Sequence, residues 1–128
     1  MNPTEVLRKY NKFAVVGTTR NKEKFGYKIY KTIKNYDKIA FPVNQRYNSI
    51  DGELCFSSIS EIPEKPEVVV AVVPPRATDK LIDECKRLGI DVMWLQPGTY
   101  NDDTLQKCKD VDIEAVYGAC IMLKLKEQ

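Results

Sequence analysis

The sequence predicts an α/β domain built on a parallel β-sheet. Short apolar runs of strand length alternate with segments in which apolar residues recur every three or four positions, the spacing of one helix face. Such alternation is typical of βαβ units, whose strands pair in parallel. The 128 residues, 43% of them apolar, suffice for one core, and we expect a single domain over residues 1–128.

The first elements are a short helix and an apolar strand. Asn2 can cap a helix that has Pro3 in its first turn and Glu5 at its third position. The apolar run at residues 13–16 then predicts a strand that ends at Gly17.

A second helix and strand follow a polar loop. Apolar residues spaced by 4, 4 and 3 positions, from Phe25 to Tyr36, predict the helix, and residues 38–43 predict the strand. Residues 45–57 are predicted to be a loop, with a turn at Asp51 and Gly52. The capping-box pattern at 58–61 predicts one helical turn that Pro63 ends.

The second half of the chain continues the alternation. Residues 67–73 are apolar on both faces, as in a buried parallel strand, and a helix from Ala77 to Leu88 follows and ends at Gly89. Residues 91–95 form the next predicted strand, and its Trp94 is expected in the core.

The remaining predicted elements are a helix capped by Asn101 and a strand at 114–117. No element is predicted beyond Gly118. Counting the predicted strands along the chain, we expect the sheet order 3-2-1-4-5 with helices on both faces, a three-layer Rossmann-like arrangement. The five strands are residues 13–16, 38–43, 67–73, 91–95 and 114–117.

Composition excludes several classes of function. The chain has no histidine, which removes Ser-His-Asp and Cys-His catalysis and His-ligated metals. Its net charge of +2 gives no basic surface for nucleic acid. The four cysteines form no C-x-x-C motif. No apolar run approaches a signal sequence or the roughly 20 residues of a membrane span, so we expect a cytoplasmic protein.

Ligands of such sheets bind beyond the carboxyl ends of the strands. In this chain the strand ends are Gly17–Arg20, Asn44–Arg46, Val73–Arg76 and Gln96–Gly98. They offer amides, hydroxyls and arginines but no carboxylate, histidine or cysteine. This set is suited to holding an anion and lacks a general base.

The first strand–helix loop is the predicted phosphate site. Gly17 permits a tight turn, and the next helix directs free backbone N–H groups toward the loop. Thr18 and Thr19 add hydroxyl groups, and Arg20 and Lys24 add positive charge. The full G-x-G-x-x-G pattern is absent, so an ordinary loop with solvated charges is the competing interpretation.

The end of the second strand bears on the choice of nucleotide. An NAD-binding domain carries an acidic residue there, but this chain has Asn44 and, two residues later, Arg46. Arg46 could contact a phosphate on the ribose, which leaves NADP and coenzyme A open. A solvated surface arginine is the alternative.

Residues after the third predicted strand have two interpretations. Pro74 and Pro75 could simply end the strand or form an apolar wall for an adenine. Asp79, Asp83 and Glu84, on the following helix, are interpreted as a solvated face.

Several motifs occur in order along nearly the whole chain, over about residues 5–125. They are Val15–Thr19, Lys24–Tyr27, Ile39–Asn44, Gly52, Ile59–Pro63, Val72–Pro75 and Trp94–Gly98. Together they resemble the small CoA-binding proteins of bacteria and archaea. That family is similar to the N-terminal CoA-binding domain of the succinyl-CoA synthetase alpha subunit.

The resemblance implies a binding mode for coenzyme A. The diphosphate would lie on Gly17–Arg20, and the ribose with its 3′-phosphate would lie near Asn44 and Arg46. The adenine would lie beside Val73–Pro75, and the pantetheine would pass Gln96.

The resemblance further implies a protein that binds CoA or acyl-CoA without catalysis. The synthetase's phosphorylated histidine belongs to another domain, and these residues include none. Three alternatives stay open: an NADP-dependent reductase, an acyl-CoA enzyme acting through Cys120, and an interaction domain with a decayed nucleotide site. The tail departs from the family, with Gly118 and Ala119 before Cys120 and Lys124 in place of an acid. A homodimer is a further expectation.

Overall fold

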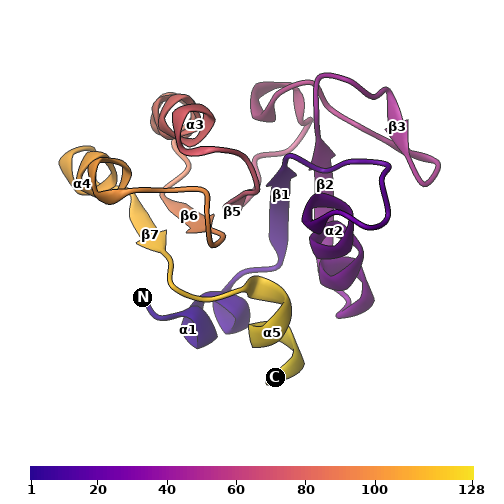
Figure 1. Cartoon of the computed structure of the whole chain (residues 1–128), viewed down its shortest axis with the longest axis horizontal. Helices are drawn as coiled ribbons and strands as arrows, with labels where there is room; N and C mark the ends of the chain where they lie inside the picture. The colour runs from indigo at the N-terminus through magenta and orange to yellow at the C-terminus, as the bar shows by residue number, and fades with distance from the viewer.

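Five parallel strands form a sheet between two layers of helices (Figure 1). The computed structural model describes all residues, 1–128. The sheet strands are β1 (Lys12–Val16), β2 (Ile39–Val43), β5 (Val68–Ala71), β6 (Val92–Leu95) and β7 (Glu114–Val116). The helices are α1 (Pro3–Lys9), α2 (Phe25–Asn35), α3 (Pro75–Leu88), α4 (Asp102–Asp110) and α5 (Ile121–Lys126). The predicted α/β class and Rossmann-like fold are confirmed.

Each strand alternates its side chains between the two helix layers. In β1, Phe13 and Val15 belong to the part of the core on the side of α1, α2 and α5, whereas Ala14 belongs to the part on the side of α3 and α4. Trp94 of β6 is fully buried, as predicted, and its Nε1 donates a hydrogen bond of 3.1 Å to the Ala119 carbonyl. The sheet therefore has an apolar core on both faces.

The sheet order is β2-β1-β5-β6-β7, and Phe56 adds a single parallel bridge beside Val43 of β2. The Phe56 N–H donates to the Pro42 carbonyl at 3.0 Å. Counting this one-residue segment as the third strand gives the order 3-2-1-4-5-6, which contains the predicted arrangement 3-2-1-4-5. The segment predicted to be third, 67–73, is instead β5 and lies next to β1. That central position explains why it is apolar on both faces.

Two short elements were not predicted. A hairpin of β3 (Ser49–Ile50) and β4 (Glu53–Leu54) occupies the predicted loop, and its turn lies at Asp51 and Gly52, as expected. Helix α5 follows Gly118, where no element was expected. Its six residues carry no side-chain cap, and its buried Ile121 and Leu125 attach it to the core. Tertiary packing therefore stabilises a helix too short to form alone.

The predicted helical turn exists as η1 (Ile59–Glu61), but its predicted cap does not. The Ser58 hydroxyl contacts Ser60, and Glu61 accepts a hydrogen bond from the Ser57 backbone N–H. Among all the helices, none has the length and apolar character required to cross a membrane.

Candidate functional site

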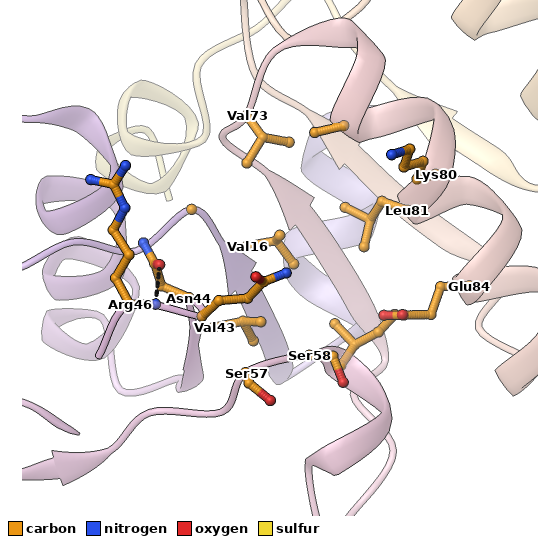
Figure 2. A pocket seen from close by; sticks show the side chains of 14 residues that line it. Val16, Val43, Asn44, Arg46, Ser57, Ser58, Val73, Lys80, Leu81 and Glu84 are labelled. Atoms are coloured by element: carbon orange, nitrogen blue, oxygen red, sulfur yellow. Dashed lines mark hydrogen bonds between the residues drawn. The ribbon is translucent and has the colours of Figure 1, made fainter. Parts of the chain in front are cut away.

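Two adjoining pockets lie beyond the carboxyl ends of β1, β2 and β5. The first, here the α3 pocket, has a volume of about 410 Å³ and lies between the segment 57–59 and helix α3 (Figure 2). The second, here the α2 pocket, has a volume of about 590 Å³ and lies at the first loop and the start of α2. Gly17, Asn44 and Arg46 line both. The two pockets therefore adjoin at these three residues.

Two glycines bring three backbone segments into contact beside these pockets. Gly17 has a φ of 103°, and a Cβ there would overlap the carbonyl oxygen of Val72 at the end of β5. A Cβ on Gly26, in the first turn of α2, would overlap the carbonyl oxygen of Gly17. Only glycine permits this approach. The first loop is thus held between β5 and α2.

The start of α2 has free hydrogen-bond donors. The backbone N–H groups of Phe25 and Gly26 donate to no acceptor in the chain, and the Lys24 side chain makes no cap. All three residues line the α2 pocket. Unpaired N–H groups and the positive end of the helix dipole favour an anion. An anion in this pocket would contact the unpaired N–H groups, the positive end of the helix dipole and the Lys24 charge.

The first-loop residues predicted to bind phosphate divide into two groups. Gly17, Thr19 and Lys24 line the α2 pocket. Thr18 is fully buried and its hydroxyl donates to the Val15 carbonyl at 2.6 Å, so it lines neither pocket. Arg20 also lies outside both, because its Nε donates to the Ser49 carbonyl at 2.9 Å.

Tyr47 lines the α2 pocket and was missed by the sequence reasoning. Its hydroxyl lies 3.1 Å from the Thr19 Oγ1, and the Arg20 guanidinium lies over its ring, 5.0 Å from the centroid. The hydrogen bond with Thr19 lowers the pKa of Tyr47 below its usual value, and the charges of Arg46 and Arg20 act in the same direction. Nothing in a predicted loop distinguishes this tyrosine from its neighbours.

The β3–β4 hairpin is fastened to α2. The Tyr27 hydroxyl donates to Asp51 at 2.7 Å, and Lys31 pairs with the same carboxylate at 3.4 Å. The Tyr27 hydrogen bond holds the pKa of Asp51 below its usual value. Lys34 pairs with Glu53 on the second hairpin strand. These contacts fix the hairpin that follows Tyr47.

Asn44 connects the end of β2 to the first loop. Its Nδ2 donates to the Thr18 carbonyl at 2.8 Å, and its Oδ1 accepts from the Arg46 N–H at 2.9 Å. The Arg46 side chain is exposed and has no partner in the chain. Its guanidinium is therefore available to a ligand at the junction of the pockets.

Of the other predicted site residues, some line a pocket and others support the fold around it. Val73 lines the α3 pocket and Pro74 the α2 pocket, whereas Pro75 opens helix α3 and lines neither. Gln96 is 5% exposed, accepts from the Ile121 N–H at 2.8 Å and donates to the Cys120 Sγ at 3.4 Å. Neither Gln96 nor Cys120 lines the site.

Helix α3 supplies residues that were not predicted. Lys80, Leu81 and Glu84 line the α3 pocket. Glu84 was expected on a solvated face. That expectation is wrong, because the amphipathic helix turns the face that carries Leu81 toward the segment 57–59. The strand ends themselves hold no carboxylate, as expected. The helical spacing of these three residues was the available signal.

The family model described as a CoA binding domain matches residues 11–126. The chain belongs to this family. The resemblance found in the sequence is therefore confirmed. Of the solved structures, a hypothetical protein from Pyrococcus horikoshii OT3 is similar to this CoA-binding domain with a TM-score of 0.92 and 29% identity, covering 98% of this chain and 88% of that one.

The curated relatives include ADP-forming acetate–CoA ligases. The ligase of Methanocaldococcus jannaschii is 30% identical over 60% of this CoA-binding domain and 11% of its own length. The alpha subunit of ligase II from Pyrococcus furiosus is 32% identical over 60% of this chain and 17% of its own. The chain thus spans less than a fifth of these ligases.

Replacing Gly26 by alanine tests the backbone contact at the first loop. In an ordinary helix Gly→Ala stabilises by about 0.5–1 kcal/mol, but here the added Cβ meets the Gly17 carbonyl. We expect Gly26→Ala to lower the free energy of unfolding by about 1–3 kcal/mol, the usual cost of overpacking. Urea denaturation measures the change.

Gly98→Ala is the control, since a Cβ at Gly98 meets nothing within 4 Å although its φ is 87°. We expect it to cost less than Gly26→Ala. A Gly26→Ala protein as stable as the original would contradict the packing described for the loop.

Proposed function

We propose that this chain binds coenzyme A or acyl-CoA without catalysing a reaction, with the diphosphate at the start of α2. The unpaired N–H groups of Phe25 and Gly26, beside Lys24 in the α2 pocket, carry this proposal. A diphosphate supplies the acceptors and charge that such a position favours. Membership of the CoA-binding domain family supports the same ligand.

The adenosine is proposed to lie in the α3 pocket. In Rossmann-like sheets a nucleotide lies across the strand ends at the point where strand order reverses, here between β1 and β5. Val16, Val43 and Val73 give this pocket apolar walls against which a base can pack. Gly17, shared by both pockets, then lies below the link between base and diphosphate.

Arg46 is proposed to bind the 3′-phosphate. It lies at the junction of the pockets, where the ribose would be, and its guanidinium has no partner in the chain. A guanidinium can hold a phosphate through two parallel N–H bonds.

The absence of catalysis is proposed from the side chains that line the site. No histidine or cysteine lines either pocket, and Glu84, the one carboxylate, lies on the α3 side, away from the α2 pocket. The α2 pocket therefore offers hydrogen-bond donors and positive charge without a strong proton acceptor.

Binding of CoA should raise the melting temperature of the protein. A ligand at about 100 times its Kd adds roughly 2.7 kcal/mol of stability. We expect CoA to give a larger thermal shift than NAD or NADP at equal concentration, since only CoA carries the 3′-phosphate proposed to bind Arg46. A larger shift with NAD would contradict the proposal.

Lys24→Ala and Lys22→Ala form a matched pair in the same assay. Lys24 lines the α2 pocket and Lys22 does not, although both belong to the first loop. We expect Lys24→Ala to reduce the CoA shift and Lys22→Ala to preserve most of it. Equal losses would indicate a diffuse electrostatic effect.

Arg46→Ala should weaken CoA more than dephospho-CoA. Hydrogen bonds to charged groups contribute about 1.5–3 kcal/mol, and exposure of this one favours the lower value. We expect about a tenfold loss of CoA affinity by calorimetric titration and little change for dephospho-CoA. Arg8→Ala, on α1, is the control. Equal losses for both ligands would move Arg46 to the diphosphate.

The isolated chain should not form acetyl-CoA from acetate, CoA and ATP. It has no histidine to carry a phosphoryl group and no G-x-x-x-x-G-K-[ST] loop for ATP. We expect no product above background under conditions in which a full-length ADP-forming ligase is active. Product formation that is lost with Arg46→Ala or Lys24→Ala would refute a binding-only role.

A further inference from the structure

The α3 pocket has one basic side chain at one end, and a lysine and a carboxylate, Lys80 and Glu84, at the other. Figure 2 shows Arg46 at the end next to the α2 pocket and Glu84 at the end formed by α3. Between them lie the apolar side chains Val16, Val43, Val73 and Leu81. A ligand that fits this pocket therefore has an anionic end, a flat apolar middle and a hydrogen-bond donor at its far end.

Glu84 lacks a strong partner within the chain. Its side chain is only 26% exposed, and no hydrogen bond of the chain ends on its carboxylate. Arg87 Nη2 lies 3.9 Å from its Oε2, at the limit of an ion pair, and the Arg87 side chain is 65% exposed. Lys80, one turn earlier on α3, makes no ion pair with it, although both line the pocket.

A partly buried carboxylate without a donor is poorly solvated, and a ligand donor would stabilise it. Asp83, the neighbouring residue, differs: it is 64% exposed and pairs with Lys107 at 2.9 Å on the α4 side. The two adjacent acids thus face different surroundings. Only Glu84 is directed at the pocket (Figure 2).

We infer that Glu84 determines base specificity by accepting a hydrogen bond from the 6-amino group of adenine. The inference rests on the proposed function, which sets the phosphates at the Arg46 end and so directs the outer edge of the base toward α3. Adenine presents an amino donor at position 6, which a carboxylate accepts. Hypoxanthine and guanine present an oxygen there, which repels a carboxylate placed to meet the amino group, and their ring donor is the N1–H instead.

Two ligands that differ at position 6 and in the hydrogen on the adjacent N1 test the inference. They are CoA and its inosine analogue, in which a 6-oxo group replaces the 6-amino group. We expect the original protein to bind CoA about tenfold more tightly by calorimetric titration, the discrimination given by one hydrogen bond to a charged group. Glu84→Gln should bring this ratio close to one, because a glutamine amide can either accept or donate.

Asp83→Asn is the matched control, since it removes a charge one residue away that points out of the pocket. It should retain the tenfold preference, and the melting temperatures of both variants report their folding. An original protein that binds the two ligands equally, or a Glu84→Gln protein that keeps the preference, would overturn the inference alone. Failure to bind CoA at all would overturn the proposed function as well.

Discussion

The contact of three backbone segments at Gly17 is the constraint on which the site depends. The end of β1 meets the Val72 carbonyl on one side and Gly26 of α2 on the other, with no space for a Cβ at either glycine. This packing brings the first turn of α2 to the carboxyl end of the sheet. The unpaired N–H groups of Phe25 and Gly26 face a pocket as a direct consequence.

The same loop positions the residues that follow β2. The Gly17 N–H donates to the Val43 carbonyl at 3.0 Å, and the Asn44 amide holds the Thr18 carbonyl. Arg46, two residues later, is therefore set between the two pockets. The polar side chains predicted around Gly17 therefore have two different roles. Thr18, Arg20 and Asn44 form hydrogen bonds that hold the loops. Lys24 and Arg46 make no such bonds and are available to a ligand.

Local patterns predicted the parts of the fold that local forces determine. Apolar runs and helical spacing located every sheet strand and four of the five helices. The position of Gly17 in the site was predicted because it directly follows the first strand. The segment that lies beside β2 could not be located in this way. It pairs through a single bridge at Phe56, and no apolar run surrounds this residue. Helix α5 depends on Gln96 and on buried contacts distant in sequence. Glu84 was predicted to face solvent because the segment that faces it across the pocket, 57–59, is distant in sequence and local patterns do not reveal that contact.

A crystal structure of the protein with CoA bound would show where the diphosphate and the adenine lie. We expect diphosphate oxygens within hydrogen-bond distance of the Phe25 and Gly26 N–H groups, and an adenine between η1 and α3. A diphosphate bound elsewhere, with these two N–H groups facing only solvent, would contradict the proposed binding mode.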